Sequence, residues 1–467
     1  MPVSGSTNVH PLIKKSAQSD VPYQKLILEL PPQIIHFRQN TKVSLIRHHN
    51  SLLVIHGIIF YSDYMAEQAF PKGPLSGLRV LDLSRVLTGP FCTMVLADLG
   101  AEVIKLEEPG SGDQTRTVPP FVNGESHYFM AINRNKKSIV VDLKSDEGRE
   151  IALSLIGESD ILIENFRPGV MDRLGLAYEK IQTEKPELII CSITGFGQEG
   201  PMAHAPSFDL VTQALSGIMS INGEKDGPPT KMGIPMGDVG GGLWAAIAVL
   251  AALQHRNATG KGLHVDLSLL DGLVALLGYL AEIFLVTGKS PGRVGSGHHS
   301  IVPYGRYPVK DGHIVLALHV GPFWRKFCHA VERLDLLNDP RFKTTANRQK
   351  NRVALESIVL EILSKKTSDE WCDLFSAADI PSGPVLDIGE ALSQASITHR
   401  GLVKAINNPK AGSIDVVGSP IQFRGAFEDE PYASSATLGQ HTNTVLSELL
   451  GYDEEKLVRL KNDGIIQ

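Results

Sequence analysis

The feature that most constrains the fold of this chain is a regular alternation of strand-like and helix-like segments that begins near residue 78. Val80 and Leu81 predict a buried strand, residues 89–99 a helix, and residues 103–106 a second strand. Pro90 suits the first turn of that helix, where its missing N–H is not needed. A strand, a helix and a strand within about 30 residues form the smallest unit that joins two parallel strands.

The same alternation continues along the chain and predicts an α/β fold, in which a Rossmann-like, largely parallel sheet is covered by helices. Ligands of such sheets bind at the carboxyl ends of the strands, and the first loop at that edge is residues 84–88. The further predicted segments are strands at residues 138–143, 161–163 and 188–192, and helices at residues 146–156 and 178–183.

The next segment, residues 266–287, is expected to form one helix, and the sequence pattern changes after it. Residues 301–318 alternate around the sequence Lys-Asp-Gly at 310–312, which is a good hairpin turn, and helical patterns follow. We therefore expect a smaller α+β domain here. The chain then closes with a β-like stretch from residue 413 and two helices at residues 441–450 and 453–461.

Composition and motifs argue against several classes of protein. The net charge of −6 lacks the basic excess of a nucleic-acid-binding protein. The four cysteines are scattered and the sixteen histidines show no ligand spacing, so we expect a reducing compartment and no metal site. The apolar run at residues 243–253 is too short to cross a membrane. The absence of G-x-G-x-x-G after the first strand, of G-x-x-x-x-G-K-[ST] and of G-x-S-x-G disfavours dehydrogenases, P-loop NTPases and α/β-hydrolases.

Residues 1–72 differ from the rest and are expected to form an N-terminal extension. Residues 1–19 contain several Ser and Thr and two lysines, Lys14 and Lys15, but no acidic residue and no arginine. This composition is weakly similar to an organellar transit peptide. A poorly ordered extension, or a stretch of incorrectly predicted coding sequence, fits at least as well.

One carboxylate, Asp238, lies in an unusual run of glycines. Gly237 precedes it, three glycines follow at residues 240–242, and residues 243–253 show an apolar helix pattern. Side-chain crowding there should be low, backbone amides should lie open, and a helix N-terminus would favour the anion. Such a carboxylate suits a nucleophile in acyl transfer. The alternative is a helix cap, because Asp is a preferred N-cap residue and Gly-rich turns precede many helices.

An ordered set of motifs spread over residues 74–466 resembles the class III CoA-transferases, the family that includes formyl-CoA transferase. A narrower resemblance, carried by residues 191–197 and 300–304, is to members that transfer CoA from succinyl-CoA to a dicarboxylate such as glutarate. The motifs of the wider resemblance are LRVLD at 78–82, LGAEVIK at 99–105, GSGDQTR at 110–116, NRNKKSI at 133–139, ENFRPG at 164–169, GFGQEGP at 195–201, GD at 237–238 and LGQHT at 438–442.

The resemblance implies a large Rossmann-like CoA-binding domain made of residues 73–285 and 405–467, a small α+β domain of residues 290–400, and an interlocked homodimer. It implies that Asp238 is the nucleophile and passes through an aspartyl anhydride and an aspartyl–CoA thioester. The expected substrates are an acyl-CoA and a small carboxylic acid, with no permanently bound cofactor, no nucleic acid and no membrane. The narrower resemblance implies a mitochondrial location, with the cytoplasm as the alternative.

The resemblance also implies a set of contacts to CoA. Lys144 in this set has an alternative as a solvated lysine near a helix start. Two positions depart from the family pattern. Leu87 stands where formyl-CoA transferase has Gln, so we do not expect formyl-CoA and oxalate as substrates, and Glu108 stands where a basic CoA contact is common. The expected contacts are Val86, Leu87, Thr88, Val141, Lys144, Asn165, Phe166 and Arg173.

Two other functions share this fold. A 2-methylacyl-CoA racemase would pair Asp238 with a histidine, but the matching position is Phe208, and Asp209 beside it is the one available substitute. A non-catalytic CoA-thioester-binding protein is disfavoured by the retained Asp238. A dicarboxylate acceptor would need a second anchor, for which the candidates are Arg85, Arg116, His299 and Ser300.

Overall fold

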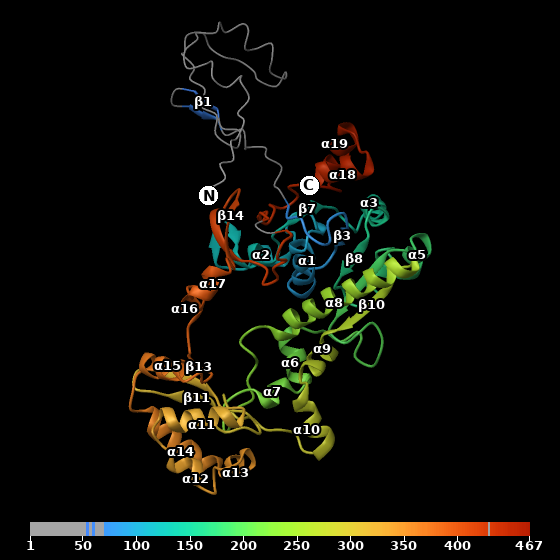
Figure 1. Cartoon of the computed structure of the whole chain (residues 1–467). Coiled ribbons are helices and arrows are strands. Elements are labelled where there is room, and N and C mark those ends of the chain that lie inside the picture. Colours follow the sequence, from blue (N-terminus) through green and yellow to red (C-terminus); the bar gives the residue numbers. More distant parts are fainter. Residues whose placement is uncertain (1–52, 56–57, 61–69, 428–429) are drawn as a thin grey trace, which may run out of the picture. The chain divides into compact units, whose positions relative to one another are not determined.

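The computed structural model describes residues 53–55, 58–60, 70–427 and 430–467 (Figure 1). Residues 1–67 and 68–467 form two separate units, which are described individually. In the first unit, β1 (Leu53–Ile55) pairs antiparallel with β2 (Ile58–Phe60). The rest of the expected extension, up to residue 69, lies outside the described residues.

The second unit is built on a six-stranded sheet in which every neighbouring pair is parallel, so the expected α/β fold is confirmed. Its strand order is β10-β9-β8-β3-β4-β7. The strands are β3 (Arg79–Asp82), β4 (Glu102–Glu107), β7 (Lys136–Val140), β8 (Ile161–Glu164), β9 (Ile189–Thr194) and β10 (His264–Ser268).

Alternate residues of these strands point to opposite faces of the sheet and enter two separate apolar cores. Val80 and Ile161 belong to one core, which is shared with α1 (Thr88–Asp98) and α8 (Met236–Thr259). Leu81 and Leu162 belong to the other. That second core is shared with α3 (Asp146–Gly157), α5 (Tyr178–Glu184), α18 (Thr442–Leu450) and α19 (Glu454–Asn462), so the C-terminal helices, red in Figure 1, pack on the sheet.

The expected single helix over residues 266–287 is wrong. Residues 264–268 form β10, which pairs with β9 at the edge of the sheet. Two helices follow, α9 (Leu269–Leu276) and α10 (Tyr279–Thr287), separated at Gly278, whose φ of 54° interrupts the helix. The prediction failed because five residues next to a long apolar helix pattern carry little strand signal of their own.

Helix α8 extends well beyond the apolar run expected at residues 243–253. By length and composition it is long and apolar enough to cross a membrane. Half of its most apolar window is buried inside the protein, where Ala245, Val249 and Ala252 enter the core against the sheet. The core helix of a soluble protein can have the same length and composition, so this feature is weak evidence for a membrane span.

A third core gathers residues between Val302 and Ile380. The hairpin expected around residues 310–312 is confirmed, because β11 (Tyr304–Pro308) pairs antiparallel with β12 (His313–Ala317), and β13 (Ser382–Pro384) adds a third strand. Helices α11 (Gly321–Ala330), α14 (Arg352–Leu363) and α15 (Ser368–Ala377) supply most of its other side chains. A hairpin of β14 (Val403–Asn408) and β15 (Gly412–Val417) follows. The domain boundaries expected from the sequence stay a prediction.

Candidate active site

The loop between β3 and α1 is held in a strained conformation at the carboxyl edge of the sheet. The backbone N–H of Arg85 donates to Asn165 Oδ1 at 2.8 Å, and Asn165 Nδ2 donates back to the Arg85 carbonyl at 2.8 Å. The next residue, Val86, has a φ of 68°, which is rare for a β-branched residue. Strain of this kind persists only where the surroundings fix the backbone, and it concentrates at functional sites.

A buried ion pair supports this loop from within the protein. The ammonium of Lys105 lies 2.9 Å from the carboxylate of Asp113 and donates to the Ser84 carbonyl at 2.8 Å. Asp113 also accepts a long hydrogen bond of 3.4 Å from the Val86 N–H. Burial opposes both charges, but their mutual attraction outweighs it, so the pKa of Asp113 is lowered and that of Lys105 is raised. Both groups therefore stay charged and fix the loop.

Asp238 is the third residue of α8, whose N-cap is Pro235, so the alternative role of Asp238 as an N-cap is wrong. Its carboxylate instead receives a hydrogen bond across the site. Thr88, the first residue of α1, donates from Oγ1 to Asp238 Oδ1 at 2.5 Å. The contact joins the start of the first helix to a residue 150 positions away.

The first amides of α8 are capped by another helix. Asp209, the first residue of α6 (Asp209–Leu215), accepts the Gly237 N–H at 2.7 Å and the Asp238 N–H at 3.4 Å through Oδ1. Its other oxygen accepts from Gln213 Nε2 at 2.8 Å. The expected open amides beside Asp238 are therefore occupied, and that expectation is wrong. Both oxygens of Asp209 are also engaged, which leaves it poorly placed as the second base of a racemase.

The glycines after Asp238 serve close packing between helices. A Cβ on Gly241 would lie 2.4 Å from the Leu269 side chain, and a Cβ on Gly242 would lie 2.8 Å from the Thr88 carbonyl. The expectation of low crowding is therefore wrong, because glycine is needed here to let α1 and α9 approach α8. This close approach brings Thr88 within hydrogen-bonding distance of Asp238.

Burial raises the pKa of the Asp238 carboxyl to about 6. The hydrogen bond from Thr88 lowers it, and the negative charge of Asp209 raises it further. The environment thus works against the anion that the sequence was expected to favour. The carboxylate is still mostly ionised at pH 7 but is less well solvated than a surface aspartate, which suits a nucleophile.

A cavity of about 320 Å³, here called the Asp238 cavity, lies beside this carboxylate. It brings together five of the eight expected CoA contacts with the expected nucleophile. Phe208, the residue at the racemase histidine position, also lines it and is 73% exposed. The expected residues in its lining are Asp238, Val86, Leu87, Thr88, Asn165 and Phe166.

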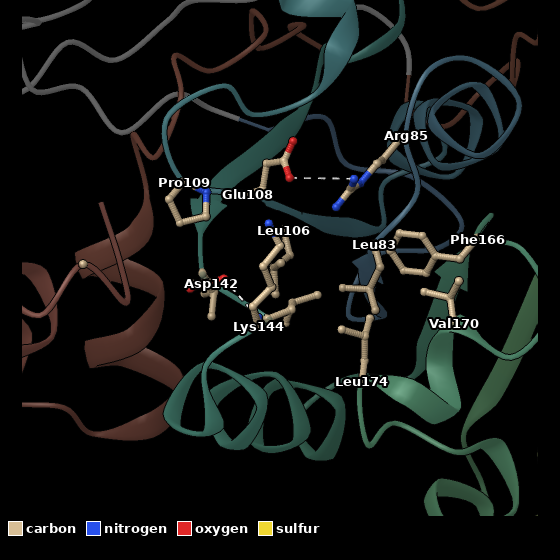
Figure 2. A pocket seen from close by; sticks show the side chains of 13 residues that line it. Leu83, Arg85, Leu106, Glu108, Pro109, Asp142, Lys144, Phe166, Val170 and Leu174 are labelled. Atoms are coloured by element: carbon tan, nitrogen blue, oxygen red, sulfur yellow. Dashed lines mark hydrogen bonds and ion pairs between the residues drawn. The ribbon is translucent and has the colours of Figure 1, made fainter.

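A second cavity of about 360 Å³, here called the Lys144 cavity, is lined by two more expected contacts, Val141 and Lys144 (Figure 2). Arg85 and Phe166 line both cavities, with the guanidinium carbon of Arg85 5.3 Å from the centre of the Phe166 ring. Figure 2 shows Arg85 pointing toward Glu108, and their nearest charged atoms are 3.9 Å apart. A ligand that passes Arg85 and Phe166 would connect the two cavities.

Some expected residues lie elsewhere. Arg173 is exposed on α4 (Val170–Arg173) and lines neither cavity. Arg116, one of the possible anchors, is committed to two hydrogen bonds of 2.7 Å with the buried Glu107. His299 and Ser300 also line neither of these cavities.

Three residues contribute to the site in ways that were not predicted from the sequence. Asp209 was considered only as a base, although an acidic residue at a helix start is a common capping signal. Lys105 and Asp113 lie within the resemblance motifs, but their pairing depends on how the loop after β4 folds back onto that strand, which no motif reveals. Within residues 70–427 and 430–467, no group of three or more His, Cys, Asp or Glu side chains is placed to bind a metal.

Residues 75–442 match the family model described as CoA-transferase family III. The chain is 42% identical over 395 residues to succinyl-CoA:glutarate CoA-transferase of Mus musculus, which covers 84% of this chain and 90% of that protein. It is 40% identical over 365 residues to acetyl-CoA:oxalate CoA-transferase of Acetobacter aceti, covering 78% and 92%. A crystal structure of a CAIB/BAIF family protein from Brucella suis superposes with a TM-score of 0.71 at 36% identity, covering 81% of this chain and 99% of that chain.

Proposed function

The chain belongs to CoA-transferase family III and is therefore a CoA-transferase, and we propose that it moves CoA from succinyl-CoA to a dicarboxylic acid such as glutarate. The observation that carries this proposal is the half-buried carboxylate of Asp238 at the wall of a cavity that shares Arg85 and Phe166 with the Lys144 cavity. The relative from Mus musculus supports the choice of substrates, since its name states succinyl-CoA and glutarate.

In the proposed mechanism, Oδ2 of Asp238 attacks the thioester carbonyl carbon, the carbon–sulfur bond breaks, and CoA leaves as a thiolate. The thiolate then attacks the aspartyl carbon of the mixed anhydride, releases the donor acid and forms an aspartyl–CoA thioester. The acceptor carboxylate attacks that thioester and expels the thiolate, which leaves a second mixed anhydride. The thiolate finally attacks the acceptor acyl carbon of this anhydride, the acyl–oxygen bond breaks, and the carboxylate of Asp238 is released. A thioester is reactive enough for a carboxylate nucleophile, and no step consumes or releases a proton.

The two cavities suit the two ends of an acyl-CoA. We assign the Lys144 cavity to the nucleotide end of CoA, because Lys144 offers an exposed ammonium to phosphate, and the Asp238 cavity to the thioester end. Val86, Leu87, Thr88, Asn165 and Phe166 would then surround the pantetheine arm. Since Arg173 lines neither cavity, its expected contact with CoA has the least support of the set.

Arg85 is the best supported anchor for the second carboxylate of a dicarboxylic acid. Arg116 is held by Glu107 and stacks on Phe129, with its guanidinium carbon 3.6 Å from the ring centre. Arg85 has only Glu108 as an acidic partner among the described residues, and both side chains of that pair are more than one third exposed. A loose, exposed ion pair of this kind contributes little stability and is readily exchanged.

Exposed apolar helix faces support the expected homodimer. None of the residues of α10 is buried, and Leu285 and Val286 are 72% and 70% exposed. On α8, Leu243 and Ile247 are 47% and 56% exposed, one helical turn apart. Exposed apolar patches can mark protein–protein interaction sites, and a second copy of this chain is the proposed partner. For the location we propose the mitochondrion, which a reporter fused to residues 1–72 tests directly.

The function is tested by a panel assay that pairs succinyl-CoA with glutarate, oxalate, hydroxymethylglutarate and carnitine. We expect new thioesters with glutarate and hydroxymethylglutarate in preference to the other two. The same enzyme incubated with a 2-methylacyl-CoA in deuterated water should leave the α-proton in place, because Phe208 cannot transfer a proton. Rapid deuterium incorporation without acid-dependent CoA transfer would replace the proposal with the racemase.

A further inference from the structure

The hydroxyl of Thr88 is hydrogen-bonded to the carboxylate of Asp238, the proposed nucleophile. Thr88 is 4% exposed, and its Oγ1 is 2.5 Å from Asp238 Oδ1. Its methyl group packs against α8 at Gly241, where an added Cβ would lie 3.1 Å from it. The resemblance assigned Thr88 to CoA binding, but its hydroxyl is already committed to the carboxylate.

Resting on the proposed function, we propose that Thr88 is a catalytic hydrogen-bond donor to Oδ1 of Asp238. In the first step the hydroxyl occupies Oδ1, so that Oδ2 is the oxygen free to attack the thioester. In the steps that attack the aspartyl carbon, the same hydroxyl donates to the same oxygen while it carries the negative charge of the tetrahedral adduct. Thr88 thus acts in the steps in which the aspartyl carbon itself is attacked.

The electron flow defines which steps need Thr88. When the CoA thiolate attacks Cγ of the Asp238 anhydride, the carbonyl electrons move onto Oδ1. They return as the bond from Cγ to Oδ2 breaks, and the donor acid leaves with Oδ2. When the acceptor carboxylate attacks the thioester, Oδ1 is charged again, and the bond from Cγ to sulfur breaks. In the remaining two steps the charge develops on the oxygen of the substrate acyl group, which Thr88 does not touch.

Donors aimed at a developing oxyanion are among the largest contributions to acyl transfer, and the loss of one typically lowers the rate by about 10²- to 10³-fold. The first amides of α8 are unavailable for this role because Asp209 occupies them. Thr88 is therefore the donor at hydrogen-bonding distance from the Asp238 carboxylate among the described residues. This makes the hydroxyl hard to replace by a neighbouring group.

The experiment compares Thr88→Val, which keeps the shape and removes the donor, with Thr88→Ser, which keeps the donor. Each enzyme is mixed with succinyl-CoA without an acceptor, quenched rapidly and weighed intact, so that the aspartyl–CoA adduct is followed directly. We expect Thr88→Val to form the adduct about 10²- to 10³-fold more slowly and Thr88→Ser to recover most of the rate. Thr93→Val is the matched control, because Thr93 is an equally buried threonine of α1 whose hydroxyl donates to Asp82 at 2.6 Å.

A pH profile separates catalysis from packing. The acidic limb of kcat/KM should move to higher pH in Thr88→Val, because the hydrogen bond from Thr88 lowers the pKa of Asp238. The other groups that face this carboxylate are Asp209 of α6, Tyr128 of α2 (His127–Ile132), and the arginines Arg85 and Arg167 of the cavity wall, and all are unchanged in the variant. In Thr93→Val the limb should not move.

The outcomes are distinguishable. A folded Thr88→Val enzyme with the wild-type rate of adduct formation and the wild-type pH limb overturns the role of Thr88 while the proposed function stands. A wild-type enzyme that forms no adduct with succinyl-CoA overturns the proposed function itself. If Thr88→Val does not fold, Thr88→Ala supplies the test, and an unchanged rate and pH limb in that variant count equally against the proposal.

Discussion

The carboxylate of Asp209 caps the amide of Gly237 at 2.7 Å, one residue before Asp238, so the two acidic side chains share the start of α8. One of them fixes the backbone and the other faces the cavity. Their proximity has an electrostatic consequence, since the charge of Asp209 raises the pKa of Asp238. The first turn of α8 thereby combines a rigid backbone with a carboxylate that is harder to ionise than an ordinary aspartate.

Replacing Asp209 separates these two effects. Asp209→Asn keeps an oxygen for the Gly237 amide and removes the charge, so the acidic limb of kcat/KM should move to lower pH. Because its amide nitrogen cannot accept the hydrogen bond from Gln213 Nε2, the melting temperature should also fall, but less than in the alanine variant. Asp209→Ala removes the cap as well and should lower the free energy of unfolding by about 0.5–2 kcal/mol. A pH limb that stays in place in Asp209→Asn would show that the two carboxylates do not interact.

Asp238→Asn should abolish CoA transfer and stabilise the protein. The pKa of Asp238 is raised in the folded state, from 3.8 to about 6, so the unfolded state ionises more readily. The folded protein therefore loses stability as pH rises from about 4 to 6, and the full penalty remains at pH 7. Removal of the ionisable group should therefore raise the free energy of unfolding by about 1–3 kcal/mol at pH 7.

Thermal unfolding of wild type and Asp238→Asn at pH 4 and pH 7 tests whether the substitution stabilises the protein. The variant should be more stable than the wild type at pH 7. This difference should nearly vanish at pH 4, where the wild-type carboxyl is protonated in the folded state. Loss of stability at pH 7 would mean that the ionised carboxylate is favoured by its surroundings. CoA transfer at the wild-type rate in this variant would remove Asp238 from the mechanism.

The buried pair of Lys105 and Asp113 should be essential for stability. Lys105→Met leaves the carboxylate of Asp113, which is 0% exposed in its side chain, without its cation. Breaking a buried pair by removing one partner typically lowers the free energy of unfolding by about 3–5 kcal/mol. Lys326→Met breaks the exposed pair with Asp379 and should lower the free energy of unfolding by only about 0–1 kcal/mol. If a denaturant titration showed the same loss of stability in both variants, burial would not determine how much the pair of Lys105 and Asp113 contributes to stability.

The parallel sheet was predictable because most of its strands are short apolar runs flanked by a helix pattern, as at Val80 and Leu81. Asp238 stood out as a candidate nucleophile because the surrounding glycines are local in the chain, and that role stays a prediction. Prediction from the sequence failed where the cause is not local. The hydrogen bond between Thr88 and Asp238 spans 150 positions, and the need for Gly241 appears only when Leu269 is packed against it. Strand β10 was missed because its signal comes from pairing with β9, some 70 residues earlier in the chain.

Arg85 and Glu108 should together determine which acceptor acid the enzyme prefers. If the Arg85 guanidinium binds the second carboxylate of glutarate, the acid must displace Glu108, whose carboxylate lies 3.9 Å from it. Arg85→Met should therefore raise KM for glutarate by about tenfold or more, which corresponds to about 1.4 kcal/mol. It should leave KM for a monocarboxylic acid of the same length unchanged.

Glu108→Gln should act in the opposite direction, because it removes the negative charge that competes with the acceptor. We expect a lower KM for glutarate in this variant and no change for the monocarboxylic acid. Arg167→Met is the matched control, since Arg167 is an exposed arginine that lines the Asp238 cavity but not the Lys144 cavity. The measurement is initial rates at saturating succinyl-CoA, with the KM for succinyl-CoA determined separately. If Arg85→Met raised the KM for succinyl-CoA and spared glutarate, Arg85 would be a contact to CoA, and the acceptor would be anchored elsewhere.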